Sequence, residues 1–165
     1  MESVKVIADK KGRKYLAKII DSSEETSSKS YIFVVHLIHR NTQVGITKCF
    51  VDLEEKSICL ADITICNEVE RNLEDRIKAF FLNDPKTYRR LGLGSELLKI
   101  VIEKAQKSGV QCLYGRVTQQ DFKDNPNLLN WYKKFGFCVE PPLPKDASKD
   151  IARICLYFKP MNCGQ

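Results

Sequence analysis

The sequence lacks several features that would assign it to a common class. It has no apolar run long enough to span a bilayer, which takes about 20 residues, and no apolar signal-peptide stretch near its start. We therefore expect neither membrane insertion nor secretion, and we predict a cytoplasmic protein. Its seven cysteines include no C-x-x-C pair, and an odd number without framework spacing favours a reducing compartment. We predict no metal site.

Long blocks of lysine or arginine are also missing. The net charge is +6, but basic residues are spread among acidic ones, without the alternation of aromatic and basic residues typical of RNA-binding proteins. We do not expect a nucleic-acid partner. An apolar fraction of 43% excludes a disordered chain, and 165 residues can bury a core. We predict one domain over residues 1–165.

Glycine is sparse, yet two glycines lie close together in residues 88–95, a basic turn that leads into an apolar-periodic segment. Gly92 and Gly94 allow positive φ and close approach of a ligand to the backbone. The first turn of a helix has unpaired N–H groups and the positive end of the helix dipole, which suit a phosphate group. Arg89 and Arg90 can add charge-assisted hydrogen bonds. The turn is typical of a pyrophosphate site.

The helix after this turn is well marked, but two familiar nucleotide motifs are excluded. A P-loop requires Gly-Lys-Ser/Thr, and a dinucleotide fingerprint requires a third glycine where this chain has Leu97. Ser108-Gly109 ends the helix. The residues that share its apolar face are Leu97, Leu98, Val101, Ile102 and Ala105.

A second motif lies at residues 125–137. Asn125 is a favourable N-cap and Pro126 a favourable first helical residue, which predicts a short helix over about 126–134. Gly136 then ends the helix, and Phe137 begins a strand.

Together the two motifs resemble those of the GNAT acetyltransferase superfamily. The acyl-CoA motif of that family reads Arg/Gln-x-x-Gly-x-Gly/Ala, which Arg89, Gly92 and Gly94 satisfy. The second family motif has Asn, six residues, Tyr, and then a Gly-Phe pair. It is matched by Asn125, Tyr132, Gly136 and Phe137. The resemblance covers residues 58–140.

The resemblance implies an α/β (α+β) fold of three layers, with a mixed, mostly antiparallel central sheet and flanking helices. It also implies acetyl-CoA as cosubstrate and direct transfer of its acetyl group, in a ternary complex, to a primary amine of a small molecule or peptide. No cysteine nucleophile is required. The alternative is a non-catalytic acyl-CoA-binding or protein-interaction module on the same fold.

The resemblance also assigns roles to residues. The strand end at Ile63 and Ile65 would offer backbone N–H groups to the thioester oxygen. Tyr132 would protonate the leaving sulfur, unless it is an ordinary half-buried aromatic residue. Asn125 would contact pantetheine or only cap its helix. The residues that would bind the pyrophosphate are Arg89, Arg90, Leu91, Gly92, Leu93, Gly94 and Ser95.

A general base is harder to assign from the sequence. We predict Glu68, which follows the strand closely, and Asp62 within the strand is the alternative. His36 and His39 are three residues apart on one strand, so alternation places them on opposite faces, and we interpret both as ordinary strand residues.

The rest of the chain predicts a sheet and one inserted helix. Val4, Val6 and Ala8 alternate with polar residues, which indicates a strand. Residues 68–82 keep helical spacing and form an insertion relative to the family. This insertion could cover exposed core, wall the acceptor site or form a homodimer contact. Little helical periodicity precedes residue 67, whereas the family usually has one or two helices there. Further strands are predicted at 15–20, 31–39, 44–53, 57–66, 111–117, 137–140 and 151–159.

Overall fold

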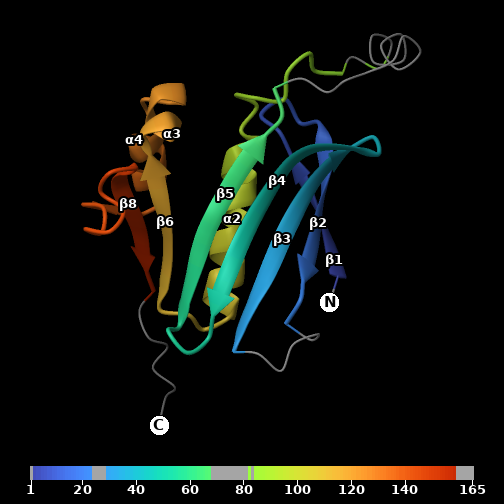
Figure 1. Ribbon diagram of the computed structural model, residues 1–165. Coiled ribbons are helices and arrows are strands. Elements are labelled where there is room, and N and C mark those ends of the chain that lie inside the picture. The colour runs from blue at the N-terminus through green and yellow to red at the C-terminus, as the bar shows by residue number, and fades with distance from the viewer. Residues whose placement is uncertain (1, 24–28, 68–81, 83, 159–165) are drawn as a thin grey trace.

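The described residues of the computed structural model, 2–23, 29–67, 82 and 84–158, form an eight-stranded sheet with three helices (Figure 1). Its elements agree with the predicted strands to within about two residues. The strands are β1 (Glu2–Ala8), β2 (Lys14–Asp21), β3 (Ser30–His39), β4 (Thr42–Asp52), β5 (Ser57–Ile65), β6 (Cys112–Thr118), β7 (Cys138–Glu140) and β8 (Asp150–Tyr157). The helices are α2 (Leu93–Lys107), α3 (Gln119–Asp124) and α4 (Leu128–Lys133).

The sheet is mixed and mostly antiparallel, as the sequence predicts. Its strand order is β1-β2-β3-β4-β5-β6-β8-β7, so the first five strands form a meander and β8 lies between β6 and β7. The one parallel step of this sheet joins β5 to β6, where Ser57–Leu60 pairs with Cys112–Gly115. Helix α2 connects these two strands, as a parallel step requires.

A bulge in β5 lies at the point where its pairing with β6 ends. Cys49 of β4 faces Leu60, while the neighbouring Lys48 faces Asp62, so Ala61 has no partner in β4. An extra residue of this kind bends a strand and increases its twist. Beyond Leu60, β5 continues to Ile65 without a partner on its β6 side in the described part of the sheet.

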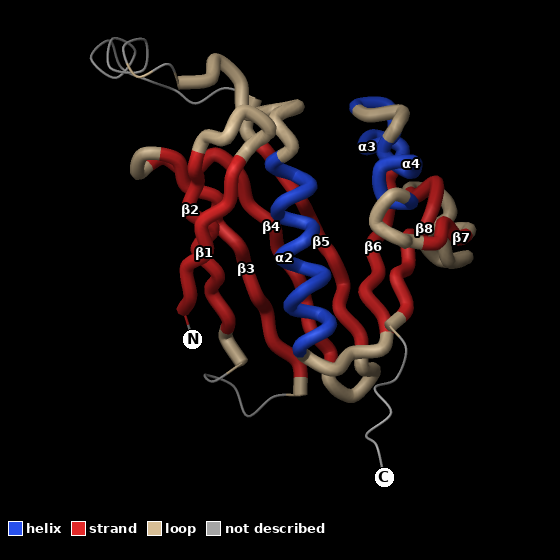
Figure 2. The backbone as a smooth tube through the Cα atoms, turned by 180° about the vertical axis from the view of Figure 1, so that it is seen from behind, coloured by secondary structure: helices blue, strands red, loops and turns tan. Residues whose placement is uncertain are grey.

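Helix α2 covers one face of the sheet, as Figure 2 shows. Its first turn begins at Leu93 and its last ends before Ser108 and Gly109, as the sequence predicts. The largest fully buried side chains between the helix and the sheet include Tyr15, Phe33, Leu37, Ile58, Leu93, Leu97, Leu98 and Leu113. None of the described helices is both long and apolar enough to cross a membrane.

No described helix crosses the opposite face, which is the one seen in Figure 1. In β1 the buried residue is Ile7, so the alternating Val4 and Val6 point to the uncovered face and are each 58% exposed. Five residues separate β1 from β2 and eight separate β2 from β3, so neither connection is long enough for the one or two helices that the GNAT family usually places after its first strand. The predicted helix over 68–82 lies, apart from Leu82, outside the described residues.

The segment after β6 differs from the prediction in part. The helix predicted over about 126–134 is α4, but α3 precedes it, and Asn125 is the C-cap of α3. Thr118 begins α3 with a capping box, because its hydroxyl accepts from the Asp121 amide while the Asp121 carboxylate accepts from the Thr118 amide. The predicted N-cap role of Asn125 is therefore wrong. Asn127 precedes α4 instead, without a side-chain cap.

Candidate functional site

The N-terminus of α2 presents unpaired backbone amides. Its N-cap is Gly92, with φ at +86° and no side-chain hydrogen bond to the first turn among the described residues. The amides of Ser95 and Glu96 donate to the Gly92 carbonyl over 3.0 and 3.2 Å. Those of Leu93 and Gly94 find no backbone acceptor in the described part of the chain. The helix therefore offers donors and a positive dipole end to an anion.

The arginines before this helix are exposed and connect the turn to the end of β5. Arg89 Nε lies 3.4 Å from the carbonyl oxygen of Ile65, to which it donates. Arg90 adopts a positive φ of +61°, which is uncommon for a residue with a side chain. Within the described residues neither guanidinium forms an ion pair with a carboxylate. Both charges are thus available to a ligand.

The end of β5, the start of α2 and helix α4 meet at Gly94. A β-carbon built on Gly94 would lie 3.9 Å from Ile65 Cγ1 and 4.0 Å from Trp131 Cζ2. Beside it, Trp131 Nε1 donates a 3.0 Å hydrogen bond to Ser95 Oγ. The two predicted motifs, which are separated by β6 and α3 in the chain, are therefore in direct contact.

Tyr132 follows Trp131 and is 8% exposed. Its ring packs edge-on against Trp131 and Phe137, at centroid distances of 4.7 and 5.4 Å. Burial raises the pKa of its phenol well above the ordinary value, and the carboxylates of Asp121 and Asp62 add to the increase. The phenol therefore keeps its proton at physiological pH.

The residues of β5 beyond the bulge are held from the β4 side. Thr47 is fully buried, and its hydroxyl donates to the carbonyl of Asp62 over 2.6 Å. The exposed Asp62 carboxylate accepts from the Thr64 hydroxyl over 2.7 Å. The side chain of Ile65 fits over Gly45, where an added β-carbon would come within 2.8 Å of its Cδ1. Ile63 is half-buried against the core.

Two predicted residues are not brought into this site by the described structure. Glu68 lies outside the described residues, so its assignment as base stays a prediction. Asn125 is exposed, and its side-chain oxygen accepts from the Asn127 amide over 3.3 Å. The two histidines do lie on opposite faces, with His39 buried and His36 Nδ1 2.6 Å from Gln43 Oε1.

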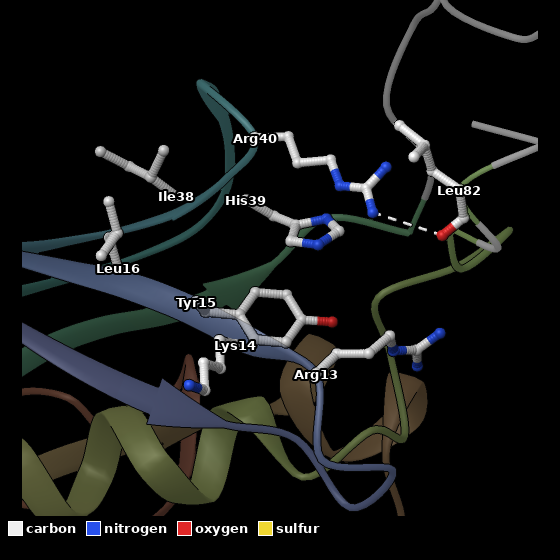
Figure 3. A pocket seen from close by; sticks show the side chains of 8 residues that line it. All are labelled: Arg13, Lys14, Tyr15, Leu16, Ile38, His39, Arg40 and Leu82. Carbon is white, nitrogen blue, oxygen red and sulfur yellow. Dashed lines mark hydrogen bonds between the residues drawn. The ribbon is translucent and has the colours of Figure 1, made fainter. Parts of the chain in front are cut away.

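A separate pocket lies at the ends of β2 and β3 (Figure 3). In it, the rings of Tyr15 and His39 are stacked with centroids 4.7 Å apart, and His39 Nδ1 is 3.2 Å from the Tyr88 hydroxyl. Arg40 reaches over them to Asp84 at 3.0 Å and to the carbonyl oxygen of Leu82 at 3.3 Å. The lining residues are Arg13, Lys14, Tyr15, Leu16, Ile38, His39, Arg40 and Leu82.

Sequence reasoning missed this pocket because its residues come from three separate segments. The signal that the sequence offers is a histidine at position 39, and a histidine in a strand pattern is more often an ordinary strand residue than part of a pocket. In the described part of the chain, no group of three or more His, Cys, Asp or Glu residues is arranged to hold a metal.

Comparison with known proteins identifies this arrangement. The model of the Acetyltransferase (GNAT) family matches residues 80–137, which include the glycine turn, α2 and Tyr132. The chain has the GNAT fold. The family model itself covers segment 80–137, and the described sheet, mostly antiparallel with one parallel step, is consistent with that fold. Curated proteins provide no match to this sequence.

Solved structures similar to this GNAT fold include three acetyltransferases. The ribosomal-protein-S18-alanine N-acetyltransferase of Escherichia coli is 20% identical, with a TM-score of 0.52 over 87% of this chain and 79% of that one. Arabidopsis thaliana Naa50, in complex with the bisubstrate analogue CoA-Ac-MVNAL, is 18% identical, with a TM-score of 0.54 over 76% and 72%. A GNAT family acetyltransferase of Elizabethkingia anophelis with acetyl-CoA bound is 14% identical, with a TM-score of 0.51 over 82% and 80%.

Proposed function

We propose that this chain is an acetyl-CoA-dependent N-acetyltransferase that acts by direct transfer in a ternary complex. The observation that carries this proposal is the meeting of Ser95, Trp131 and Ile65 around Gly94. This contact joins a helix start with unpaired amides to the helix of a buried, protonated phenol, beside the part of β5 that lies beyond its pairing with β6.

The residues around the start of α2 fit a pyrophosphate group. Gly92 has a backbone conformation that strains any other residue, and a β-carbon there would come within 3.2 Å of Lys10. The glycine thus keeps the backbone accessible where the amides of Leu93 and Gly94 are unpaired. Arg89 and Arg90 would add charge-assisted hydrogen bonds to phosphate oxygens. Leu91 and Ser95 complete the turn.

Acetyl-CoA would supply the thioester carbonyl and its thiol leaving group. The backbone of β5 at Ile63 and Ile65 would orient that carbonyl, since this edge is free of β6. The Tyr132 hydroxyl would give its proton to the sulfur, since burial keeps the phenol in its protonated form. Asn125 would contact the pantetheine arm from the α3–α4 turn.

The proton of the attacking amine requires a separate acceptor. Glu68 is the residue that we propose from the sequence. Among the described residues, Asp62 is the carboxylate on the bulged strand, and its exposed side chain accepts a hydrogen bond from the Thr64 hydroxyl. A carboxylate next to the attacking nitrogen can orient the amine and take its proton, directly or through water.

A primary amine of a small molecule or peptide is the proposed acceptor. The Naa50 complex, whose bisubstrate analogue carries the peptide sequence MVNAL, supports a peptide amine. The connections on either side of β2 are too short for the helices that the family usually places after its first strand, and we propose residues 68–82 as the wall of the acceptor site or as a homodimer contact. A cytoplasmic location stays a prediction from the cysteine pattern.

Thermal unfolding in the presence of acetyl-CoA tests this proposal, with ATP and NAD as polyanion controls. At about a hundred times Kd, a bound ligand adds about 2.7 kcal/mol to the free energy of unfolding. For a domain of this size that corresponds to an increase in Tm of roughly 5–10 °C. A panel of peptide and small-molecule amines is then incubated with acetyl-CoA, and acetylated products are detected by mass spectrometry. Equal shifts with all three nucleotides would contradict the proposal.

The uncovered sheet face supports the alternative of a non-catalytic module. Val4, Val6 and Phe50 are more than half exposed on this face, and such apolar surface often marks an interaction site. Binding of acetyl-CoA without product from any amine, and without hydrolysis, would favour that function over catalysis.

A further inference from the structure

The turn between β1 and β2 is held rigidly by one buried carboxylate. Asp9 Oδ1 accepts from the amides of Lys11 and Arg13 over 2.8 and 3.0 Å. Its Oδ2 accepts from Arg13 Nε over 2.7 Å and from the Tyr15 hydroxyl over 3.0 Å. Because the Asp9 side chain is fully buried, these bonds are protected from water. Such a turn can hold an exposed residue in a defined place.

That turn packs directly against the glycine turn before α2. The amide of Lys10 donates a 3.0 Å hydrogen bond to the carbonyl of Leu91. Along the Lys10 side chain, Cγ, Cδ and Cε stand 3.2, 3.7 and 3.3 Å from the place that a β-carbon would take on Gly92. Since Nζ is bonded to Cε, the ammonium group lies close to Gly92, the N-cap of α2.

Several cations gather here without carboxylate partners. Lys10, Arg89 and Arg90 are exposed, and none forms an ion pair within the described residues. The carboxylate nearest to Lys10 in sequence, Asp9, is already engaged by Arg13. Like charges that converge on a helix N-terminus repel one another unless an anion neutralises them.

We propose that Lys10 binds a phosphate group of the acyl-CoA, and that Asp9 is the residue that positions it. This inference rests on the proposed function, because it names a further binding residue for the same cosubstrate. The pyrophosphate and the 3′-phosphate present the same chemistry to an ammonium group. Lys10 comes from the first hairpin, outside the segment that matches the family model, so it adds to the amides of the glycine turn.

Isothermal titration of the full chain with CoA and with dephospho-CoA tests the proposal. The variants are Lys10→Ala and Lys10→Arg, and Lys11→Ala is the matched control because it removes the same charge from the same turn. At about 0.1 M salt we expect Lys10→Ala to raise the Kd for CoA about five- to tenfold, in line with one charge-assisted hydrogen bond at an exposed site. Lys11→Ala should change the Kd less than about twofold, and Lys10→Arg should retain most of the affinity.

The outcomes separate this inference from the proposed function. If the unaltered chain does not bind CoA, the proposed function itself is wrong. Binding by the unaltered chain with equal Kd values for Lys10→Ala and Lys11→Ala would overturn the role of Lys10 alone. If Lys10→Ala weakens the binding of both CoA and dephospho-CoA, Lys10 contacts the pyrophosphate. If it weakens the binding of CoA alone, Lys10 contacts the 3′-phosphate. Unchanged thermal midpoints in the three variants exclude unfolding as the cause.

Discussion

The Trp131 indole nitrogen and the Ser95 hydroxyl are joined by a 3.0 Å hydrogen bond. The two residues are 36 positions apart, one on α4 and the other in the first turn of α2. The bond fixes Tyr132, the next residue after Trp131, relative to the glycine turn. It therefore links the part of the site that would bind phosphate to the part that would transfer a proton.

A double-mutant cycle of Ser95→Ala and Trp131→Phe measures this link. Loss of one hydrogen bond should lower the free energy of unfolding by about 1 kcal/mol for Ser95→Ala. Trp131→Phe should lower it further, because the indole also packs against Tyr132 and Phe135. We expect a coupling energy of about 0.5–1.5 kcal/mol in urea denaturation. Strict additivity of the two changes would contradict the hydrogen bond.

Gly92→Ala should weaken CoA binding, whereas its loss of stability should resemble that of Gly109→Ala. Gly92 and Gly109 both have positive φ, at +86° and +68°, so an alanine at either position costs about 1–2 kcal/mol of backbone strain. At Gly109 nothing lies within 4 Å of the added methyl group, whereas at Gly92 it would meet the Lys10 side chain, which can move aside. We expect similar losses in thermal unfolding but weaker CoA binding, by titration, in Gly92→Ala alone. Equal CoA affinities in the two variants would argue against a ligand at the glycine turn.

Tyr132→Phe should lower turnover about a hundredfold or more, as expected when a general acid is lost. The Kd for CoA should stay within about twofold, since the phenol would act on the sulfur and not on the phosphates. Because the pKa of Tyr132 is raised, the phenol keeps its proton below about pH 10, and its deprotonation should not reduce the rate in that range.

Tyr157→Phe is the control for this change, because it removes an exposed phenol that bonds to Glu140. Steady-state rates from pH 6 to about pH 10, with saturating acetyl-CoA, compare the two variants. Retention of full turnover by Tyr132→Phe at every pH would eliminate the assigned role.

Asp9→Asn should remove an acid-sensitive part of the stability. Burial alone would raise the pKa of Asp9, but its bonds from Arg13, Lys11 and Tyr15 outweigh that effect and hold the pKa below its usual value. A lowered pKa in the folded state contributes stability above about pH 4, and this stability is lost as the pH falls through the folded-state pKa.

The free energy of unfolding of the unaltered chain should therefore be about 2 kcal/mol higher than that of Asp9→Asn at pH 7, in line with hydrogen bonds to a charged group. In urea denaturation at several pH values, the difference should shrink below about pH 4. A difference that stays constant down to pH 2 would show that the charge on Asp9 contributes nothing.

The sheet and α2 could be predicted from the sequence because their signals are local. Strand alternation set the bounds of the meander, and the apolar positions of α2 ended at Ser108-Gly109. Alternation does not say which face of a strand is covered, however. In β1, Ile7 is buried and the exposed Lys5 pairs with Glu103 of α2, so these two lie on the helix side, while Val4 and Val6 face away.

Two features escaped the prediction for different reasons. Helix α3 has no buried residue and therefore no apolar periodicity, but the spacing of Thr118 and Asp121 carried a capping-box signal that could have found it. The contact of Lys10 with Gly92 joins segments about 80 residues apart in the chain, and no local pattern encodes it. It follows from the shortness of the first hairpin, which brings its turn beside α2.

The joint between β5 and β6 has a consequence for the motions of the molecule. Four residue pairs hold the two halves of the described sheet together, in a parallel ladder that is less stable per residue than an antiparallel one. This ladder is where we expect amide hydrogens to exchange first among the central strands, through local opening. A ligand that formed hydrogen bonds with β5 beyond Leu60 would lengthen this ladder. Amide exchange at residues 57–60 and 112–115 should then slow when the ligand binds.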